Sequence, residues 1–158
     1  MEIKRLKMKH ANNYTAYRAL NSYTKLMRAA ESVTSRTSRP MAAAGLTISQ
    51  FGVLEALLHK GPLCQRDIAA KILKSTGNIT MVIDNLEKQG LVRRERDMED
   101  RRYLTVHLTE KGTILINKVF ADVEASIVAE MSTLSADEQE QLGSLCKKLG
   151  LKGGTSQA

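Results

Sequence analysis

One short change of periodicity constrains the fold of this chain more than any other feature. Most of the sequence places its apolar residues at helical steps of three and four, but residues 91–108 hold two short strand-like runs around a polar loop. This pattern predicts a two-stranded hairpin. Because such a hairpin is only marginally stable by itself, it must pack on the helices that precede it. We therefore predict a mainly α fold with a small β-wing.

Three helices are predicted directly before the hairpin. A capping box of Thr47 and Gln50 opens the first of them. Helices over 65–73 and 76–89 follow, separated by a short break of Ser, Thr and Gly, and Gly90 is the predicted stop of the second helix. Two helices joined by a turn and followed by a hairpin form a winged helix-turn-helix, which we assign to residues 47–108 as the DNA-binding domain.

Longer helices are predicted on both sides of this winged unit, in residues 12–46 and 109–151. A capping box of Ser135 and Glu138 opens the last helix of the second range. The first, beginning at Asn12 or Asn13, repeats apolar residues at steps that mark one buried face. The helix after the hairpin carries apolar residues around most of its circumference: Ile114, Leu115, Ile116, Val119, Phe120, Val123, Ile127 and Val128. A helix of this kind must be covered on several sides, by its own chain and by a partner. We therefore predict a homodimer held together by N- and C-terminal dimerisation helices.

The charge of the chain indicates the class of partner. Lys and Arg number 24 against 17 Asp and Glu, and the net charge of +7 favours a polyanion such as nucleic acid. We expect residues 1–11 to be a flexible basic segment and residues 152–158 a disordered tail. No apolar signal core follows the basic N-terminus, and no apolar stretch approaches the roughly 20 residues of a membrane span. We therefore expect a cytoplasmic protein without a membrane partner.

Candidate DNA contacts gather at the start of the helix over 76–89. In a helix-turn-helix the second helix lies in the major groove, with its N-terminal residues at the base edges. Short hydrogen-bonding side chains and two preceding lysines supply the candidates: Lys71, Lys74, Ser75, Thr76, Asn78 and Thr80. Helix capping by Ser75 or Thr76 explains part of the same pattern.

The hairpin loop carries a more specific signal. Residues 93–102 hold five arginines among four acids. A carboxylate beside paired arginines orients a guanidinium so that it can enter the narrow, negative minor groove. The wing candidates are Arg96, Asp100, Arg101 and Arg102. The alternative is a solvated turn with surface ion pairs, each worth under about 1 kcal/mol.

Taken together, these segments resemble the MarR family of transcriptional regulators. The matching motifs are L-T-I-S-Q-F at 46–51, G-N-I-T at 77–80, the run 83–94, D-R-R at 100–102 and L-T-E-K-G at 108–112. The resemblance covers about residues 12–150. It implies a triangular homodimer whose winged domains bind successive major grooves of a pseudo-palindromic operator in double-stranded DNA. It also implies that Arg102 is the minor-groove arginine, oriented by Asp100, with Arg101 as the alternative for that role or as a phosphate contact.

The same resemblance implies a repressor that is released by a small aromatic effector, phenolic or quinone-like. Tyr14, Tyr17 and Tyr23 on the first helix, with Phe51 on the second, are the candidates for its ligand pocket, although core packing explains these aromatic residues equally well. Cys64 stands where Ser or Thr ordinarily caps a helix. A cysteine at a helix N-terminus can become a redox sensor, and the alternative is an ordinary thiol in a capping position.

Other classes of function have little support in the sequence. No short Cys/His cluster has zinc spacing, so we expect no metal and no cofactor. Phosphate-binding, serine-hydrolase and metalloprotease motifs are missing, so we expect no enzymatic activity. Two alternatives stay open: a thiol- or metal-responsive regulator of the same fold, and an architectural protein that binds nucleic acid without sequence preference.

Overall fold

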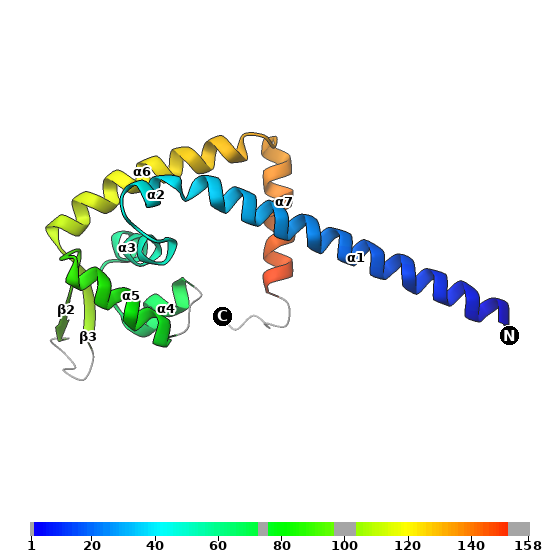
Figure 1. Ribbon diagram of the computed structural model, residues 1–158, viewed down its shortest axis with the longest axis horizontal. Coiled ribbons are helices and arrows are strands. Elements are labelled where there is room, and N and C mark those ends of the chain that lie inside the picture. Colours follow the sequence, from blue (N-terminus) through cyan, green and yellow to red (C-terminus); the bar gives the residue numbers. More distant parts are fainter. Residues whose placement is uncertain (1, 73–75, 97–103, 152–158) are drawn as a thin grey trace. The chain divides into compact units, whose positions relative to one another are not determined.

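The computed structural model describes residues 2–72, 76–96 and 104–151 of the chain (Figure 1). The chain divides into two compact units, residues 1–39 and 40–158.

The first unit is one long helix, α1 (Glu2–Thr37). The prediction that the helix begins at Asn12 or Asn13 is wrong, and the segment 1–11, predicted to be flexible, is helical from Glu2. The physical reason is composition. This segment is rich in Lys, Leu, Met, Glu and Arg, which are strong helix formers, so the two asparagines lie inside the helix and do not cap it.

The apolar side chains of α1 recur at helical steps along one face, as their spacing predicts. These side chains, expected on a buried face, are exposed in the protomer, with Tyr14, Tyr17 and Tyr23 exposed by 62–66%. Leu20 and Met27 are exposed as well. Burial of this face in a dimer stays a prediction.

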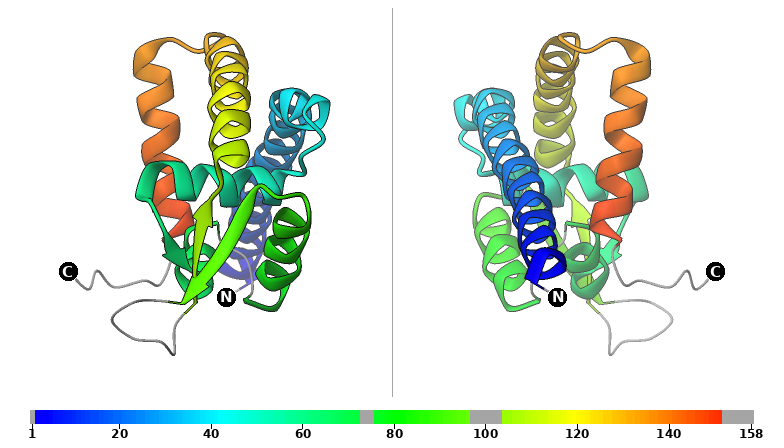
Figure 2. Two further views of the ribbon diagram at one scale, coloured as in Figure 1. Left: turned by 90° about the vertical axis from the view of Figure 1, so that its left-hand side faces the viewer. Right: turned by 90° about the vertical axis from the view of Figure 1, so that its right-hand side faces the viewer.

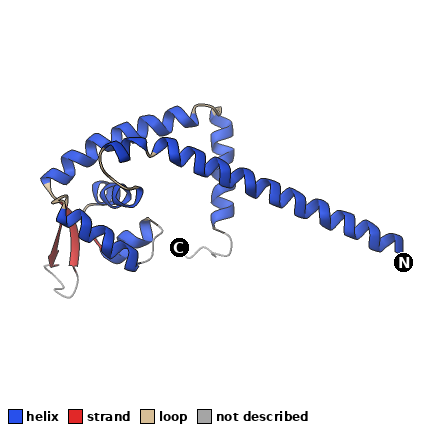
Figure 3. Ribbon diagram, viewed as in Figure 1, coloured by secondary structure: helices blue, strands red, loops and turns tan. Residues whose placement is uncertain are grey.

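The second unit holds the remaining elements. They are α2 (Arg39–Ala43), α3 (Ile48–Lys60), β1 (Leu63–Cys64), α4 (Gln65–Lys71), α5 (Thr76–Lys88), β2 (Val92–Arg96), β3 (Leu104–Leu108), α6 (Glu110–Met131) and α7 (Ala136–Gly150). The mainly helical fold with a small β-wing is thereby confirmed (Figure 3). Apart from the unpredicted α2 and β1, these elements follow the predicted order.

The core of this unit forms around α3, which contacts α4, α5, α6 and β3. Val53 and Leu54 of α3 are fully buried. They meet side chains from the surrounding elements that are equally inaccessible: Ile68, Ile79, Ile83, Leu86, Val106 and Ile116. The helix-turn-helix and the wing therefore rest on one shared core, as expected for a hairpin that is too small to stand alone.

The sheet has one strand more than predicted. Its order is β1-β3-β2, and both pairings are antiparallel. The hairpin register runs from Val92 opposite Leu108 to Arg96 opposite Leu104. Figure 2 shows the two strands of the hairpin side by side. The additional strand, β1, pairs Leu63 with Val106. Two residues are too short to produce an alternating pattern, which is why the sequence predicted only two strands.

The predicted helix ends are confirmed where capping chemistry defined them. Thr47 and Gln50 form the capping box of α3, with Thr47 N donating to Gln50 Oε1 over 2.9 Å. An equivalent box of Ser135 and Glu138 opens α7. Gly90 adopts a φ of 70° after α5, a conformation that favours glycine.

Candidate nucleic-acid interface

Helix α5, the second helix of the helix-turn-helix, has two chemically different faces. Ile79, Ile83 and Leu86 are fully buried in the core. The opposite face is exposed and consists mainly of polar side chains: Asn78, Thr80, Met81, Asn85 and Lys88. Because the buried isoleucines anchor the helix on one side, the exposed face is held in a defined direction.

A hydrogen bond joins α5 to the helix before it. Gln65 Nε2, on the first residue of α4, donates to Thr80 Oγ1 over 3.1 Å. Sequence reasoning did not single out Gln65, because its partner lies fifteen residues away and only the contact between the two helices brings them together. This bond fixes a predicted DNA-contacting residue relative to α4.

Arg94 ties the wing to α5. It lies on β2, and its guanidinium donates to Asp84 Oδ1 and Glu87 Oε2, each over 2.5 Å. The Arg94 backbone N–H also donates to Glu87 Oε1 over 3.0 Å. Burial by itself lowers the pKa of Arg94, but the hydrogen bonds to Asp84 and then Glu87 outweigh it and raise the pKa. With only 17% of its side chain exposed, Arg94 is a structural bridge.

The opposite face of the hairpin carries a second polar cluster. Arg93 Nε donates to Glu95 Oε1 over 2.5 Å, and this hydrogen bond lowers the pKa of Glu95. His107 Nε2 lies 3.5 Å from Glu95 Oε2 and 2.9 Å from Thr105 Oγ1. The alternation of β2 thus sends Arg93 and Arg94, adjacent in sequence, into two different ionic clusters.

The base of the wing is bonded to the start of α6. Thr109 N donates to the Leu91 carbonyl over 3.1 Å, and Thr109 Oγ1 donates to the Gly90 carbonyl over 2.7 Å. Lys111 Nζ donates to the Gln89 carbonyl over 2.8 Å. These three bonds connect the end of α5, the beginning of β2 and the first turn of α6.

Gly112 allows this close approach. A Cβ atom at this position would collide with the carbonyl oxygen of Leu91. The L-T-E-K-G motif at 108–112 therefore has a physical explanation: its threonine caps α6 and bonds the α5–β2 connection, and its glycine lets the helix reach that backbone.

Comparisons with known proteins identify the family. The profile of the MarR family matches residues 46–104. YkoM, an uncharacterized HTH-type transcriptional regulator of Bacillus subtilis strain 168, is 38% identical over 140 residues, which are 89% of this chain and 91% of that protein. The chain belongs to the MarR family.

Two further likenesses extend over most of this MarR-family protein. The HTH-type transcriptional regulator MhqR of Bacillus subtilis strain 168 is 37% identical and covers 85% of this chain and 92% of its own length. The crystal structure of NadR in complex with 4-hydroxyphenylacetate is similar with a TM-score of 0.67 and 25% identity, and covers 80% of this chain and 89% of that one. The prediction of a MarR-family transcriptional regulator is confirmed.

The predicted DNA contacts of this MarR-family protein fall on three elements. Lys71 is exposed at the end of α4, and Asn78 and Thr80 are exposed on α5, which contacts α4. Thr76 begins α5, and Arg96 is exposed at the end of β2. The other predicted contacts lie outside the described residues: Lys74, Ser75, Asp100, Arg101 and Arg102.

The predicted sensor residues have different environments. Tyr14, Tyr17 and Tyr23 are exposed on α1, whereas Phe51 is 6% exposed and packs in the core of the second unit. Cys64 occupies the N-cap position of α4 as predicted, but its side chain makes no capping hydrogen bond there. Its thiol is half-buried.

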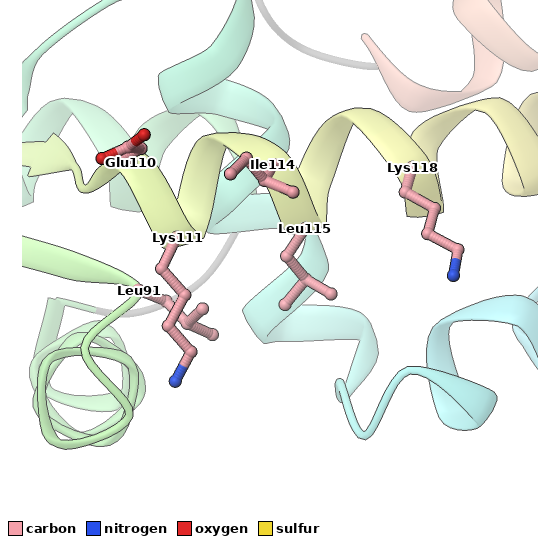
Figure 4. A pocket seen from close by; sticks show the side chains of 6 residues that line it. All are labelled: Leu91, Glu110, Lys111, Ile114, Leu115 and Lys118. Carbon is pink, nitrogen blue, oxygen red and sulfur yellow. The ribbon is translucent and has the colours of Figure 1, made fainter.

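An open apolar hollow of about 460 Å³ lies along the first half of α6. Leu91, Ile114 and Leu115 are among the residues that line it, and so are Lys111 and Lys118, whose long side chains are drawn in Figure 4. None of the four residues predicted for a ligand pocket contributes to this hollow.

The described part of the chain offers neither a cluster of metal ligands nor a single helix suited to span a membrane. Within it, no group of three or more His, Cys, Asp or Glu side chains is arranged to hold a metal ion. No single helix there is long and apolar enough to cross a membrane, and only the bent pair of segments 13–43 and 48–60 reaches that threshold, by length and composition alone.

Proposed function

We propose that this protein is a homodimeric repressor that binds a pseudo-palindromic operator and releases it when a phenolic or quinone-like compound binds. In each protomer α5 enters a major groove. The wing reaches the adjacent minor groove with Arg102, which Asp100 orients, and Arg101 is the alternative for that contact.

The division of α5 into two faces carries the DNA-binding part of this proposal. A helix that is fully buried along one face and offers amide and hydroxyl groups along the other has the chemistry that base edges and phosphates require. The wing supports the same arrangement, because the Arg94 bridge holds the hairpin against α5. Helix α5 and the wing can therefore contact the same duplex.

Exposed apolar side chains at both ends of the chain support a homodimer. On α1 they are the tyrosine stripe with Leu20 and Met27, and on α6 they include Ile127 and Val128. Leu142, Leu145 and Leu149 of α7 are exposed too, at helical steps of three and four. Apolar stripes of this length call for a partner, and a second copy offers the same stripes in return.

The effector class is supported by the likeness to NadR, which was crystallised with the phenolic compound 4-hydroxyphenylacetate. The three exposed α1 tyrosines are the residues that we propose for contact with such an effector. Their rings can stack on an aromatic ligand, and their hydroxyl groups can bond its polar substituent.

Duplex selection by the full-length protein tests the proposal. We expect a two-fold symmetric sequence, bound about a thousandfold or more tightly than a scrambled duplex, with a steep salt dependence. A reporter behind the selected site should be repressed. Adding 4-hydroxyphenylacetate or benzoquinone should lower the affinity. Equal affinity for scrambled DNA would establish the architectural alternative, and reporter activation would refute the repressor role.

A further inference from the structure

An apolar side chain stands in the middle of the polar face of α5. Met81 is 65% exposed, although Ile79 and Ile83, two residues away on either side, are fully buried. The exposed stripe on which it lies consists of Asn78, Met81, Asn85 and Lys88, at steps of three, four and three. Side chains at these steps share one face of a helix.

The members of this stripe match the major-groove edge of an A·T base pair. An asparagine amide bonds adenine N6 and N7 together, and an apolar side chain packs on the 5-methyl group of thymine. Neither contact is offered by a G·C pair, whose major-groove edge lacks both the adenine amine and the methyl group. The exposed Met81 side chain keeps apolar surface in contact with water, which is unfavourable. Packing against a thymine methyl group would remove this surface from water.

The spacing of the two residues fits successive base pairs. Asn78 and Met81 are three residues apart, which is about 4.5 Å along a helix axis. Base pairs along one DNA strand are about 3.4 Å apart. Both residues lie in the N-terminal half of α5, the half that meets base edges in a helix-turn-helix.

The rotation of α5 is fixed by contacts on both sides of the stripe. The buried isoleucines hold the helix in the core, and the hydrogen bond from Gln65 to Thr80 joins the residue beside Met81 to α4. Asn78 and Met81 are therefore held on the same exposed face, and α5 does not have to rotate before it contacts DNA.

We propose that Asn78 and Met81 select A·T base pairs in each operator half-site. Met81 covers the 5-methyl group of a thymine, and Asn78 bonds the adenine edge of the neighbouring pair. This inference rests on the proposed function, because it requires α5 to lie in the major groove.

Removal of single methyl groups from the DNA tests the role of Met81. The probe is the duplex selected by the full-length protein, with each thymine replaced in turn by deoxyuridine. At one thymine in each half-site the loss of the methyl group should weaken wild-type binding by about three- to fivefold. Met81→Ala should bind the thymine and deoxyuridine duplexes equally. Ile48→Ala, which truncates another exposed apolar side chain, should keep the wild-type ratio.

Asn78 is tested in the same way with 7-deazaadenine, which lacks only the N7 acceptor. Wild-type protein should discriminate against it at one adenine per half-site, and Asn78→Ala should not. Asn117→Ala, at an exposed asparagine of α6, is the matched control. If no thymine shows a methyl effect, or if Met81→Ala retains it, the inference is overturned while the proposed function stands. If the protein selects no sequence, the proposed function itself fails.

Discussion

At the residue scale, the arginines of the wing show how one residue type takes different roles. Residues 93–102 contain five arginines, which the sequence presents as one basic group. In the structure, the described arginines of this segment have different surroundings. Arg94 bonds two carboxylates of α5, Arg93 pairs with Glu95 on the other face, and Arg96 is exposed at the end of β2. The alternation of side chains along β2 and the register of the hairpin together determine which arginine meets which partner. The alternation could be predicted from the sequence, but the register could not.

Replacement of Arg94 should destabilise the fold. Arg94→Ala removes two charge-assisted hydrogen bonds of the guanidinium at the α5–β2 junction and leaves Asp84 and Glu87 without that counter-charge, so we expect a loss of about 1–3 kcal/mol in the free energy of unfolding. Urea denaturation measures it. Arg66→Ala is the control, because its side chain is 82% exposed. Equal effects of the two substitutions would contradict the bridging role of Arg94.

Replacement of Arg102 should act on DNA binding and leave stability unchanged. Arg102→Ala is expected to weaken binding to the selected operator by about 1–3 kcal/mol, because a minor-groove guanidinium contact is lost. Titration of a labelled duplex measures the change. Unchanged affinity would refute the assignment of Arg102. A loss confined to Arg101→Ala would transfer the role to the neighbouring arginine.

At the element scale, predictions succeeded where local chemistry defines an element. Thr47 with Gln50 and Ser135 with Glu138 mark helix starts, and Gly90 marks a helix end, because each satisfies backbone groups within a few residues. β1 was missed because two residues carry no period and their partners lie on β3, far away in sequence. The bond between Gln65 and Thr80 was missed for the same reason.

Alanine substitutions at two helical glycines distinguish the effect of close packing on stability from the effect of helix propensity. Gly112→Ala should destabilise the protein by about 1–3 kcal/mol, because the new Cβ would push α6 away from the Leu91 backbone. Gly143→Ala in α7 meets no atom within 4 Å, so it should stabilise by about 0.5–1 kcal/mol through helix propensity alone. Thermal unfolding of both variants measures the contrast. A neutral Gly112→Ala would show that the contact at the base of the wing is not tight.

At the scale of the whole molecule, the apolar faces of the flanking helices are the feature that one chain does not explain. The periodicity of α1 predicts an apolar face for a dimerisation helix, and the tyrosines on that face are exposed in the protomer. Periodicity reveals which side of a helix avoids water, and it does not reveal whether the cover comes from the same chain or from another. For α6 the sequence did indicate both sources, and Ile116 is buried while Ile127 is exposed.

Removal of α7 tests where the second copy binds. No residue of α7 is buried in the protomer, yet its apolar leucines align on one face, so its contribution to a dimer should exceed its contribution to the protomer fold. Deletion of residues 135–158 should therefore convert the dimer into monomers or aggregates, as measured by light scattering after size-exclusion chromatography. Deletion of residues 152–158 alone is the control and should leave the dimer intact. A soluble dimer after the longer deletion would place the interface on α1 and α6 alone, because those helices carry the remaining exposed apolar stripes.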